Sequence, residues 1–283
     1  MNGPLVVALV FLAALAQGSV AVVAVTELTG ARWAGSLKRE LLVAAPLLPL
    51  LALLFLALWP VLDHYPWAAA PGAWLNRPFF MARNLALLLA TAGAGRLLAR
   101  RALDGHPGRK GAAVAYLLLF AASQTLVAFD WVMSLSYPWV SSMFGMYFTV
   151  EATFAGLALA GLLALAVDRN RREGDRARWE AARRDLGRLL FGFSVLWGGL
   201  FFAQFMLIWY GNLPEEVGFV ATRLAAQPTR ALAVIFPAAC FGVPFLGLLA
   251  ARAKESPRVV AAVSLSILAG LIAEKLFFVL PAL

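Results

Sequence analysis

Long apolar runs separated by short polar turns dominate the sequence. A transmembrane helix needs about 20 mostly apolar residues, and eight stretches meet that length. They are Pro4–Val25, Leu41–Leu62, Phe79–Leu98, Ala112–Leu135, Trp139–Val167, Leu189–Tyr210, Ala231–Ala251 and Val259–Leu280. The runs are continuous and rich in Ala and Leu, whereas the strands of a membrane barrel are short and alternate apolar with polar residues. The pattern therefore predicts an all-α polytopic membrane protein with eight transmembrane helices.

The composition agrees with this prediction. Of the 283 residues, 62% are hydrophobic and only 14% are charged, which is too little polar surface for a soluble domain of this length. The longest polar stretch, Asp168–Arg188, mixes charges at helical spacing around Trp179. We interpret it as a helix at the cytoplasmic surface, with a docking surface for an acidic partner as the alternative. We therefore expect residues 1–283 to form a single integral membrane domain.

The basic residues are distributed unevenly between the turns. The formal net charge is +9, and most of the 24 basic residues lie in alternate turns: after Val25, after Leu98, within Asp168–Arg188, and after Ala251. Positive charge collects in cytoplasmic loops. The distribution therefore predicts that both termini lie on the outer side of the membrane, and it argues for a lipid bilayer rather than a nucleic acid as the partner of this charge.

Cysteine and histidine are too scarce to build a redox centre. The chain has one cysteine, Cys240, and two histidines, His64 and His106, both in predicted turns. These residues exclude iron–sulfur ligation, structural zinc and haem held by paired intramembrane histidines within this chain. We expect no cofactor to be bound by this chain alone, so any redox chemistry uses a diffusible molecule or the cofactors of a partner.

Several ionisable residues fall inside the predicted helices, where each costs at least about 2.5–3.5 kcal/mol. Glu151 lies about 18 Å into a hydrocarbon core of about 30 Å, with Tyr147 one turn earlier on the same face. Glu274 and Lys275 lie in the last predicted helix. Because neighbours on a helix point about 100° apart, we expect Lys275 to pair with Glu151 or Asp130 rather than with Glu274. The acids form either a proton relay or hydrogen-bonded core carboxyls.

Asp130 ends the helix Ala112–Leu135 on the predicted outer side. A carboxylate there meets the unfavourable end of the helix dipole, and no basic residue is near it in the sequence. Arg83 and Asn84 form another polar position on the outer half, where we expect Arg83 to extend towards the headgroups. We take Asp130, Glu151, Tyr147, Glu274 and Lys275 as candidates for proton transfer.

Four motifs occur in the order found in one known family. In chain order they are ELTGARWAGSLKRE (Glu27–Glu40), WLNRPFFMARN (Trp74–Asn84), FDWVMSLSYPWVSSMFGMYF (Phe129–Phe148) and AQFMLIWYGNLPEE (Ala203–Glu216). Together they resemble the ActF-type membrane subunit of alternative complex III, the bacterial quinol:electron-acceptor oxidoreductase. The chain departs from the family in its last helix, where the usual Arg-Trp pair is missing, and in having eight predicted spans rather than about ten.

The resemblance implies an NrfD-like (polysulfide-reductase-like) fold made of two four-helix bundles in the bacterial inner membrane. It implies partner subunits that carry haem and iron–sulfur clusters, namely a multihaem cytochrome, an iron–sulfur subunit and a second NrfD-like subunit. It also implies contact with a quinol, menaquinol or ubiquinol, and a role in proton translocation. By position in the motifs, candidates for an outer quinone site are Trp131, Ser134, Gln204, Tyr210, Asn212, Glu215 and Glu216.

Three roles fit these observations, and the simplest is a membrane anchor whose charges only hold helices together. In the first of the other two, the chain is a membrane subunit of a quinol oxidoreductase and has no redox centre of its own. In the second, it is a stand-alone proton or solute transporter that uses the same buried acids. Transporters commonly have broken helices at mid-membrane, and Pro237, Gly242 and Pro244 interrupt the seventh predicted helix. Function without partners would distinguish the second from the first.

Overall fold

The computed structural model describes residues 3–31, 33–168 and 176–282, and these residues contain helices and no strand. Among them, seven helical segments are long and apolar enough to cross a membrane. These segments are Gly3–Thr29, Lys38–His64, Arg109–Ser136, Phe144–Val167, Trp179–Gly211, Thr229–Gly247 and Pro257–Ala282. The prediction of an all-helical, multi-pass membrane chain is confirmed at this level.

The remaining predicted span, Phe79–Leu98, lies within α4 (Arg77–Leu103). This helix is as long as α1 (Gly3–Thr29), since both have 27 residues. Arg83 and Asn84, together with the basic residues of its last turns, make it less apolar than the other segments. The count of eight spans therefore remains a prediction.

Short helices break up several of the segments. The second segment consists of α2 (Lys38–Leu42), α3 (Leu47–Phe55) and the 3-10 helix η2 (Leu56–His64). Residues 43–46 form a turn, not the continuous helix expected over Leu41–Leu62. Pro46 has no N–H to continue the helical hydrogen bonds of α2, which accounts for the break.

The later helices follow the same order as the predicted spans. Their bounds are α5 (Arg109–Leu126), η4 (Val127–Val132), η5 (Met133–Ser136), α6 (Phe144–Asp168), α7 (Arg176–Gly211), α8 (Pro214–Ala225), α9 (Thr229–Pro237), η7 (Ala238–Gly242), α10 (Val243–Gly247) and α11 (Pro257–Val279). Short 3-10 helices fill the connections: η1 (Trp33–Ser36), η3 (Pro66–Ala69), η8 (Ala253–Glu255) and η9 (Leu280–Ala282). Both η4 and η7 are π-helical.

Two boundaries differ from the sequence prediction. The helix expected from Trp139 begins at Phe144, because residues 137–143 form a turn. The surface helix expected over Asp168–Arg188 is continuous with the sixth predicted span from Arg176 onward, forming α7 of 36 residues. Trp179 is buried in this helix, and residues 169–175 of the stretch lie outside the described part of the chain.

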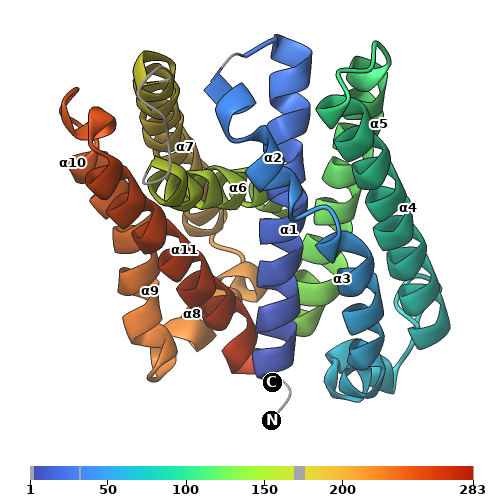
Figure 1. The fold of residues 1–283 in the computed structure, drawn as a ribbon. Helices are drawn as coiled ribbons and strands as arrows, with labels where there is room; N and C mark the ends of the chain where they lie inside the picture. Colours follow the sequence, from blue (N-terminus) through green and yellow to red (C-terminus); the bar gives the residue numbers. More distant parts are fainter. Residues whose placement is uncertain (1–2, 32, 169–175, 283) are drawn as a thin grey trace.

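Helices α1, α6 and α11 lie in the middle of the molecule, with α3, α4 and α5 on one side and α7, α9 and α10 on the other (Figure 1). Helices α1 and α6 cross in close contact. A Cβ at Gly18 would overlap the carbonyl oxygen of Ala152, and a Cβ at Gly156 would overlap that of Gly18. Small residues allow helix backbones in a membrane to approach each other closely, which explains why glycine is needed at this crossing.

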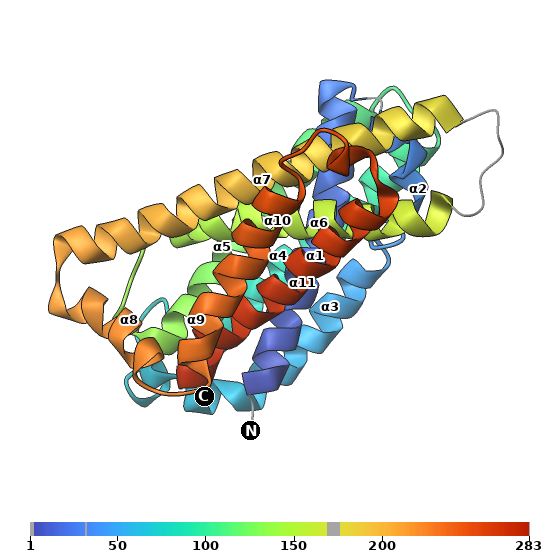
Figure 2. The ribbon, with the colours of Figure 1, turned by 90° about the vertical axis from the view of Figure 1, so that its left-hand side faces the viewer.

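The two termini lie at the same end of the molecule in both views (Figures 1 and 2). The connection between α7 and α9, which contains α8, lies at that end as well (Figure 2). The termini and this connection, which the positive-charge distribution assigns to the outer side, thus lie at one end of the molecule.

Candidate functional site

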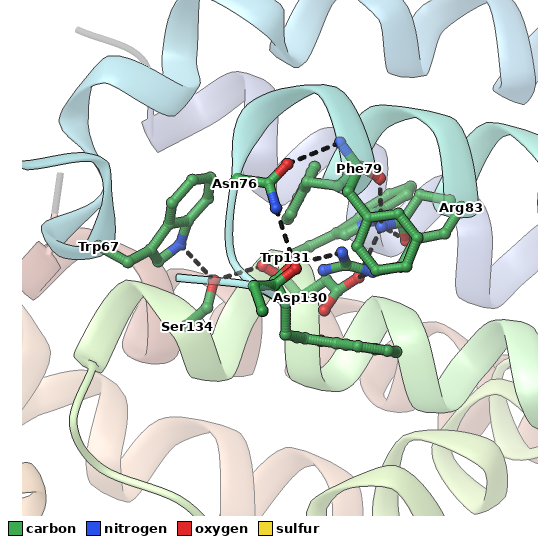
Figure 3. A network of polar contacts seen from close by, with 11 residues as sticks. Trp67, Asn76, Phe79, Arg83, Asp130, Trp131 and Ser134 are labelled. Carbon is green, nitrogen blue, oxygen red and sulfur yellow. Dashed lines mark hydrogen bonds and ion pairs between the residues drawn. The ribbon is translucent and has the colours of Figure 1, made fainter. Parts of the chain in front are cut away.

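Asp130 lies on the π-helical segment η4, directly after α5. The carboxyl group is buried, with 1% of the residue exposed. Arg83 Nε donates a hydrogen bond to Asp130 Oδ2 at 2.8 Å, and Asn84 Nδ2 donates to the same oxygen at 2.6 Å. Trp131 Nε1 in turn donates to Asn84 Oδ1 at 2.9 Å. We call Arg83, Asn84, Asp130 and Trp131 the Asp130 cluster (Figure 3).

Arg83 therefore does not extend to the headgroups, so that expectation is wrong. Its side chain is only 9% exposed, its Nη1 donates to the carbonyl of Trp74 at 2.6 Å, and the Trp74 ring lies 4.3 Å from the guanidinium carbon. Of the two alternatives considered for Lys275, the pairing with Asp130 is absent, because Asp130 pairs with Arg83. One buried atom of each partner, Arg83 Nη2 and Asp130 Oδ1, has no hydrogen-bond partner among the described residues.

The loop after η2 covers this cluster. Trp67 Nε1 donates to Ser134 Oγ at 3.2 Å, and the Ser134 hydroxyl donates to the carbonyl of Asp130. The Tyr65 hydroxyl donates to the carbonyl of Trp131 at 2.9 Å. Burial, with a smaller contribution from the charge of Asp130, raises the pKa of Tyr65 well above its usual value. Tyr65 therefore stays protonated and acts as a hydrogen-bond donor.

A second group of buried ionisable residues lies between α6 and α11. Lys275 Nζ forms an ion pair with Glu151 and reaches Glu274 Oε2 at 3.4 Å. The Tyr147 hydroxyl donates a hydrogen bond to Glu274 Oε1. Each of the four residues is at most 4% exposed. We call Tyr147, Glu151, Glu274 and Lys275 the Glu151 cluster.

The structure thus brings together four of the five residues expected to transfer protons. Of the two partners considered for Lys275, it selects Glu151. The expectation that the neighbours Glu274 and Lys275 avoid each other is only partly right, since their long side chains meet at 3.4 Å. Asp130 lies elsewhere: among the described residues, no hydrogen bond or ion pair joins it to the Glu151 cluster.

The charges of the Glu151 cluster do not balance when every group is ionised, because one lysine faces two carboxylates. A net charge buried in an apolar interior is strongly unfavourable. The cluster is neutral when the two acids together hold one proton. Glu151 Oε1 is buried and has no hydrogen-bond partner among the described side chains, so its lone pairs can hold that proton.

A cavity of about 310 Å³ borders the Glu151 cluster. Residues of α6, α7, α8, α9 and α11 form its walls, and most of them are aromatic or aliphatic. The polar side chains in the wall are Tyr147 and Gln204. Ser141 Oγ donates to Gln204 Oε1 at 2.6 Å. The cavity therefore offers an apolar space with a tyrosine hydroxyl bonded to a buried acid at its edge.

Helix α8 closes one side of this cavity with Phe219, Val220 and Leu224. The Phe219 ring stacks on Trp139 at 3.7 Å. Arg223, 3% exposed, donates through Nη2 to Ser136 Oγ at 2.9 Å and to the carbonyl of Phe278 at 2.8 Å.

No ion pair between described residues involves Arg223, although it is buried. Burial lowers the pKa of Arg223 to about 9, so the guanidinium is still charged at neutral pH. Its hydrogen bonds join α8 to η5 and to the end of α11. Sequence reasoning missed this residue, because an arginine between two apolar helices normally lies in solvent.

The seven residues expected at an outer quinone site do not form one site. Trp131 and Ser134 belong to the region of Asp130, and Gln204 lines the cavity. The other four, Tyr210, Asn212, Glu215 and Glu216, lie at the junction of α7 and α8.

The junction residues have structural explanations. Tyr210 is 85% exposed. Asn212 ends α7 with a positive φ of 46°, and its N–H donates to the carbonyl of Ile208 at 3.0 Å, as in a common helix C-terminal motif. Glu215 and Glu216 lie in the first turn of α8, where acidic side chains interact favourably with the helix dipole.

No family model matches the sequence, and no curated protein matches it. The resemblance to the membrane subunit of alternative complex III therefore rests on the four motifs alone.

Proposed function

We propose that this chain is an integral membrane subunit of a quinol:electron-acceptor oxidoreductase of the alternative complex III type, and that it takes up protons when a quinol in the aromatic cavity is oxidised. The observation that carries the proposal is the contact between that cavity and the Glu151 cluster. Tyr147 lines the cavity and at the same time donates its hydroxyl hydrogen to Glu274.

The cavity suits the ring of a quinol. Small-molecule sites are typically about 300–1,000 Å³ and mostly apolar with a few polar groups, and this one is about 310 Å³. Phe144, Phe219 and Phe278 provide aromatic walls against which a flat ring can stack. Tyr147 and Gln204 supply the hydrogen-bonding groups for its hydroxyls.

Oxidation of a quinol to a quinone releases two protons and two electrons. The Tyr147 hydroxyl accepts a hydrogen bond from the quinol and passes its own proton to Glu274, which is general-base catalysis through a tyrosine. The two acids already share one proton, so each proton that enters at Glu274 displaces one from Glu151 to an acceptor outside the cluster. The cluster thereby passes on the two protons one at a time and returns to zero net charge after each transfer. The electrons leave to haem or iron–sulfur centres on partner subunits, since cysteine and histidine are too few here.

The Asp130 cluster has a structural role in this proposal. Its ion pair with Arg83 is already neutral, and it holds the outer loop over the end of α5. The shared end of the two termini (Figure 1) supports an even number of crossings, with α4 as the eighth span. The pair of four-helix bundles in the bacterial inner membrane is proposed from the motifs, and the outer position of both termini from the distribution of basic residues.

The test compares quinol oxidation by the native assembly, captured through an affinity tag on this chain, in three variants. Tyr147→Phe and Glu274→Gln should lower turnover by about 10²–10⁴-fold, the usual contribution of a positioned acid or base. Tyr116→Phe is the matched control, because Tyr116 is equally buried and donates to the carbonyl of Gln17 far from the cavity. Equal turnover in Tyr147→Phe and Tyr116→Phe would contradict the proposal, as would an assembly without haem-bearing or iron–sulfur partners.

A stand-alone proton transporter is the second candidate, and one observation favours it. Helix α9 is interrupted by the π-helical segment η7 next to α11, where Cys240 packs against Gly270. This function requires proton flux through the purified chain in liposomes with no partner present, and flux that is lost in Glu151→Gln would establish it. The cavity favours the oxidoreductase, because a proton path does not need an aromatic site of that size.

A further inference from the structure

A second cavity adjoins the first in the crevice between α7 and the segment formed by α9 and η7, and it opens at the molecular surface, where Val195 and Phe202 are 43% and 57% exposed. It has a volume of about 510 Å³ and apolar walls. On α7 its wall includes Val195, Gly198 and Gly199, and on the other side Pro237 and Phe241. The Glu151 cluster does not line it, so the proposed proton chemistry does not explain it.

The two cavities meet at Phe201, which lines both. The order of the wall residues shows that they follow one another along the crevice. On α7 the first cavity is lined by Gln204 and Phe205 and the second by residues 195–202. On the facing helix the first is lined by Ala233 and the second by Pro237, one turn further along. From Phe205 to Val195 the helix rises about 15 Å.

The sequence keeps this crevice open in two ways. Pro237 lacks an N–H, and the backbone after it continues as the π-helical turn η7 rather than as regular α-helix. On the opposite wall, a Cβ at Gly199 would meet no atom within 4 Å, while a Cβ at Gly198 would lie 2.8 Å from the Phe241 ring. Gly198 thus allows the Phe241 ring to pack against α7, and the missing side chain of Gly199 leaves room that no described atom fills.

We propose that the second cavity binds the prenyl chain of the quinol whose ring occupies the first cavity. This inference rests on the proposed function. A prenyl chain is long, flexible and apolar, so it matches walls that offer dispersion and hydrophobic contact and almost no hydrogen bonding. The shared wall at Phe201 allows one molecule to occupy both cavities, which gives this site a preference for long-chain quinols.

The test measures binding of two naphthoquinones to the full chain in lipid nanodiscs: menadione, which has no prenyl chain, and a prenylated menaquinone with the same ring. Gly199→Leu adds an apolar side chain at the wall of the second cavity, starting from a Cβ that would have no described atom within 4 Å. Gly192→Leu is the matched control, because Gly192 is two turns away on the same helix, also has nothing within 4 Å of a Cβ, and does not line the cavity.

The unmodified chain should bind the prenylated compound more tightly than menadione. Gly199→Leu should weaken binding of the prenylated compound about tenfold, equivalent to about 1.4 kcal/mol, and leave menadione unchanged. Gly192→Leu should leave both unchanged. Thermal unfolding of each variant shows whether the change in affinity reflects the cavity or a loss of folding.

Three results would overturn the inference. The first is equal affinity of the unmodified chain for the two compounds, and the second is an equal loss in Gly192→Leu and Gly199→Leu. The third is loss of a co-purified phospholipid in Gly199→Leu with no change in quinone affinity, which would assign the crevice to a lipid acyl chain. If menadione binding responds to Tyr147→Phe but the prenyl chain adds nothing, the proposed function stands and only the chain site fails.

Discussion

The ion pair of Lys275 with Glu151 can be tested by a double-mutant cycle. Lys275→Met removes the cation while keeping a long apolar side chain, and it leaves Glu151 and Glu274 buried with no positive partner. Glu151→Gln keeps the shape of the acid and leaves Lys275 with Glu274. Removing one partner of a buried ion pair typically costs about 3–5 kcal/mol, whereas replacing both with neutral groups is often close to neutral.

The magnitude follows from burial at this site. Lys275 and Glu151 are 0% and 1% exposed, so solvent does not screen the remaining charge. We expect Lys275→Met to destabilise the protein by about 3 kcal/mol or more. Because Glu274 stays buried without a cation in the double variant, that variant should recover only part of the loss, giving a coupling energy of about 0.5–1 kcal/mol, at the lower end of the range for residues in contact.

The assay is reversible unfolding in mixed micelles, followed by circular dichroism for the parent, both single variants and the double variant. The control cycle uses Arg188 and Asp185, an ion pair 3.1 Å apart whose side chains are 65% and 48% exposed. Exposed pairs contribute about 0–1 kcal/mol, so little coupling is expected there. Additive effects of Lys275→Met and Glu151→Gln would refute the reasoning, because they would mean that the two groups do not compensate each other's charge.

Three further predictions concern packing and the other buried charges. Asp130→Asn should destabilise the protein by about 3 kcal/mol in the same unfolding assay, since it leaves Arg83 buried without its carboxylate; an unchanged midpoint would show that water already solvates Arg83. Gly18→Ala should prevent close packing of α1 on α6 and lower the yield of folded protein, whereas Gly93→Ala, with nothing within 4 Å of the new Cβ, should be tolerated; equal yields would contradict the packing argument. Arg223→Gln should loosen α8 and increase its cleavage by protease, because the bridges to η5 and α11 are lost; identical cleavage rates would count against that role.

The sequence predicted helices best where the apolar run was long and uninterrupted. The span Val259–Leu280 corresponds closely to α11, and Pro4–Val25 lies within α1. The run Leu41–Leu62 was equally apolar, but Pro46 ends the local hydrogen bonding and the segment divides into three helices. Apolar content thus predicts that a segment enters the membrane, while proline positions decide whether it does so as one helix.

The site was predictable only in part, for a related reason. Tyr147 and Glu151 are one turn apart on one helix, so their shared face follows from helical spacing, and the cost of burying Lys275 implies an acidic partner. The pairing of Arg83 with Asp130 spans 47 residues, and local sequence contains no sign of it. The pair could have been predicted from the position of Arg83 and Asp130, which lie at the same end of two consecutive predicted helices. The cavity was not predictable, because its walls come from five helices and depend on where α8 lies.

Charge balance distinguishes the Asp130 cluster from the Glu151 cluster, although the sequence analysis grouped their acids together as candidates for proton transfer. At Asp130, one carboxylate faces one guanidinium, so adding a proton would break a neutral pair and leave Arg83 uncompensated. At Glu151, two acids face one lysine, so a proton can move between the acids while the sum of charges stays at zero. A buried site can exchange protons at low cost only when its charge is balanced before and after the transfer. The Glu151 cluster satisfies this condition through its second acid, and for that reason we place the proposed proton transfer there rather than at Asp130.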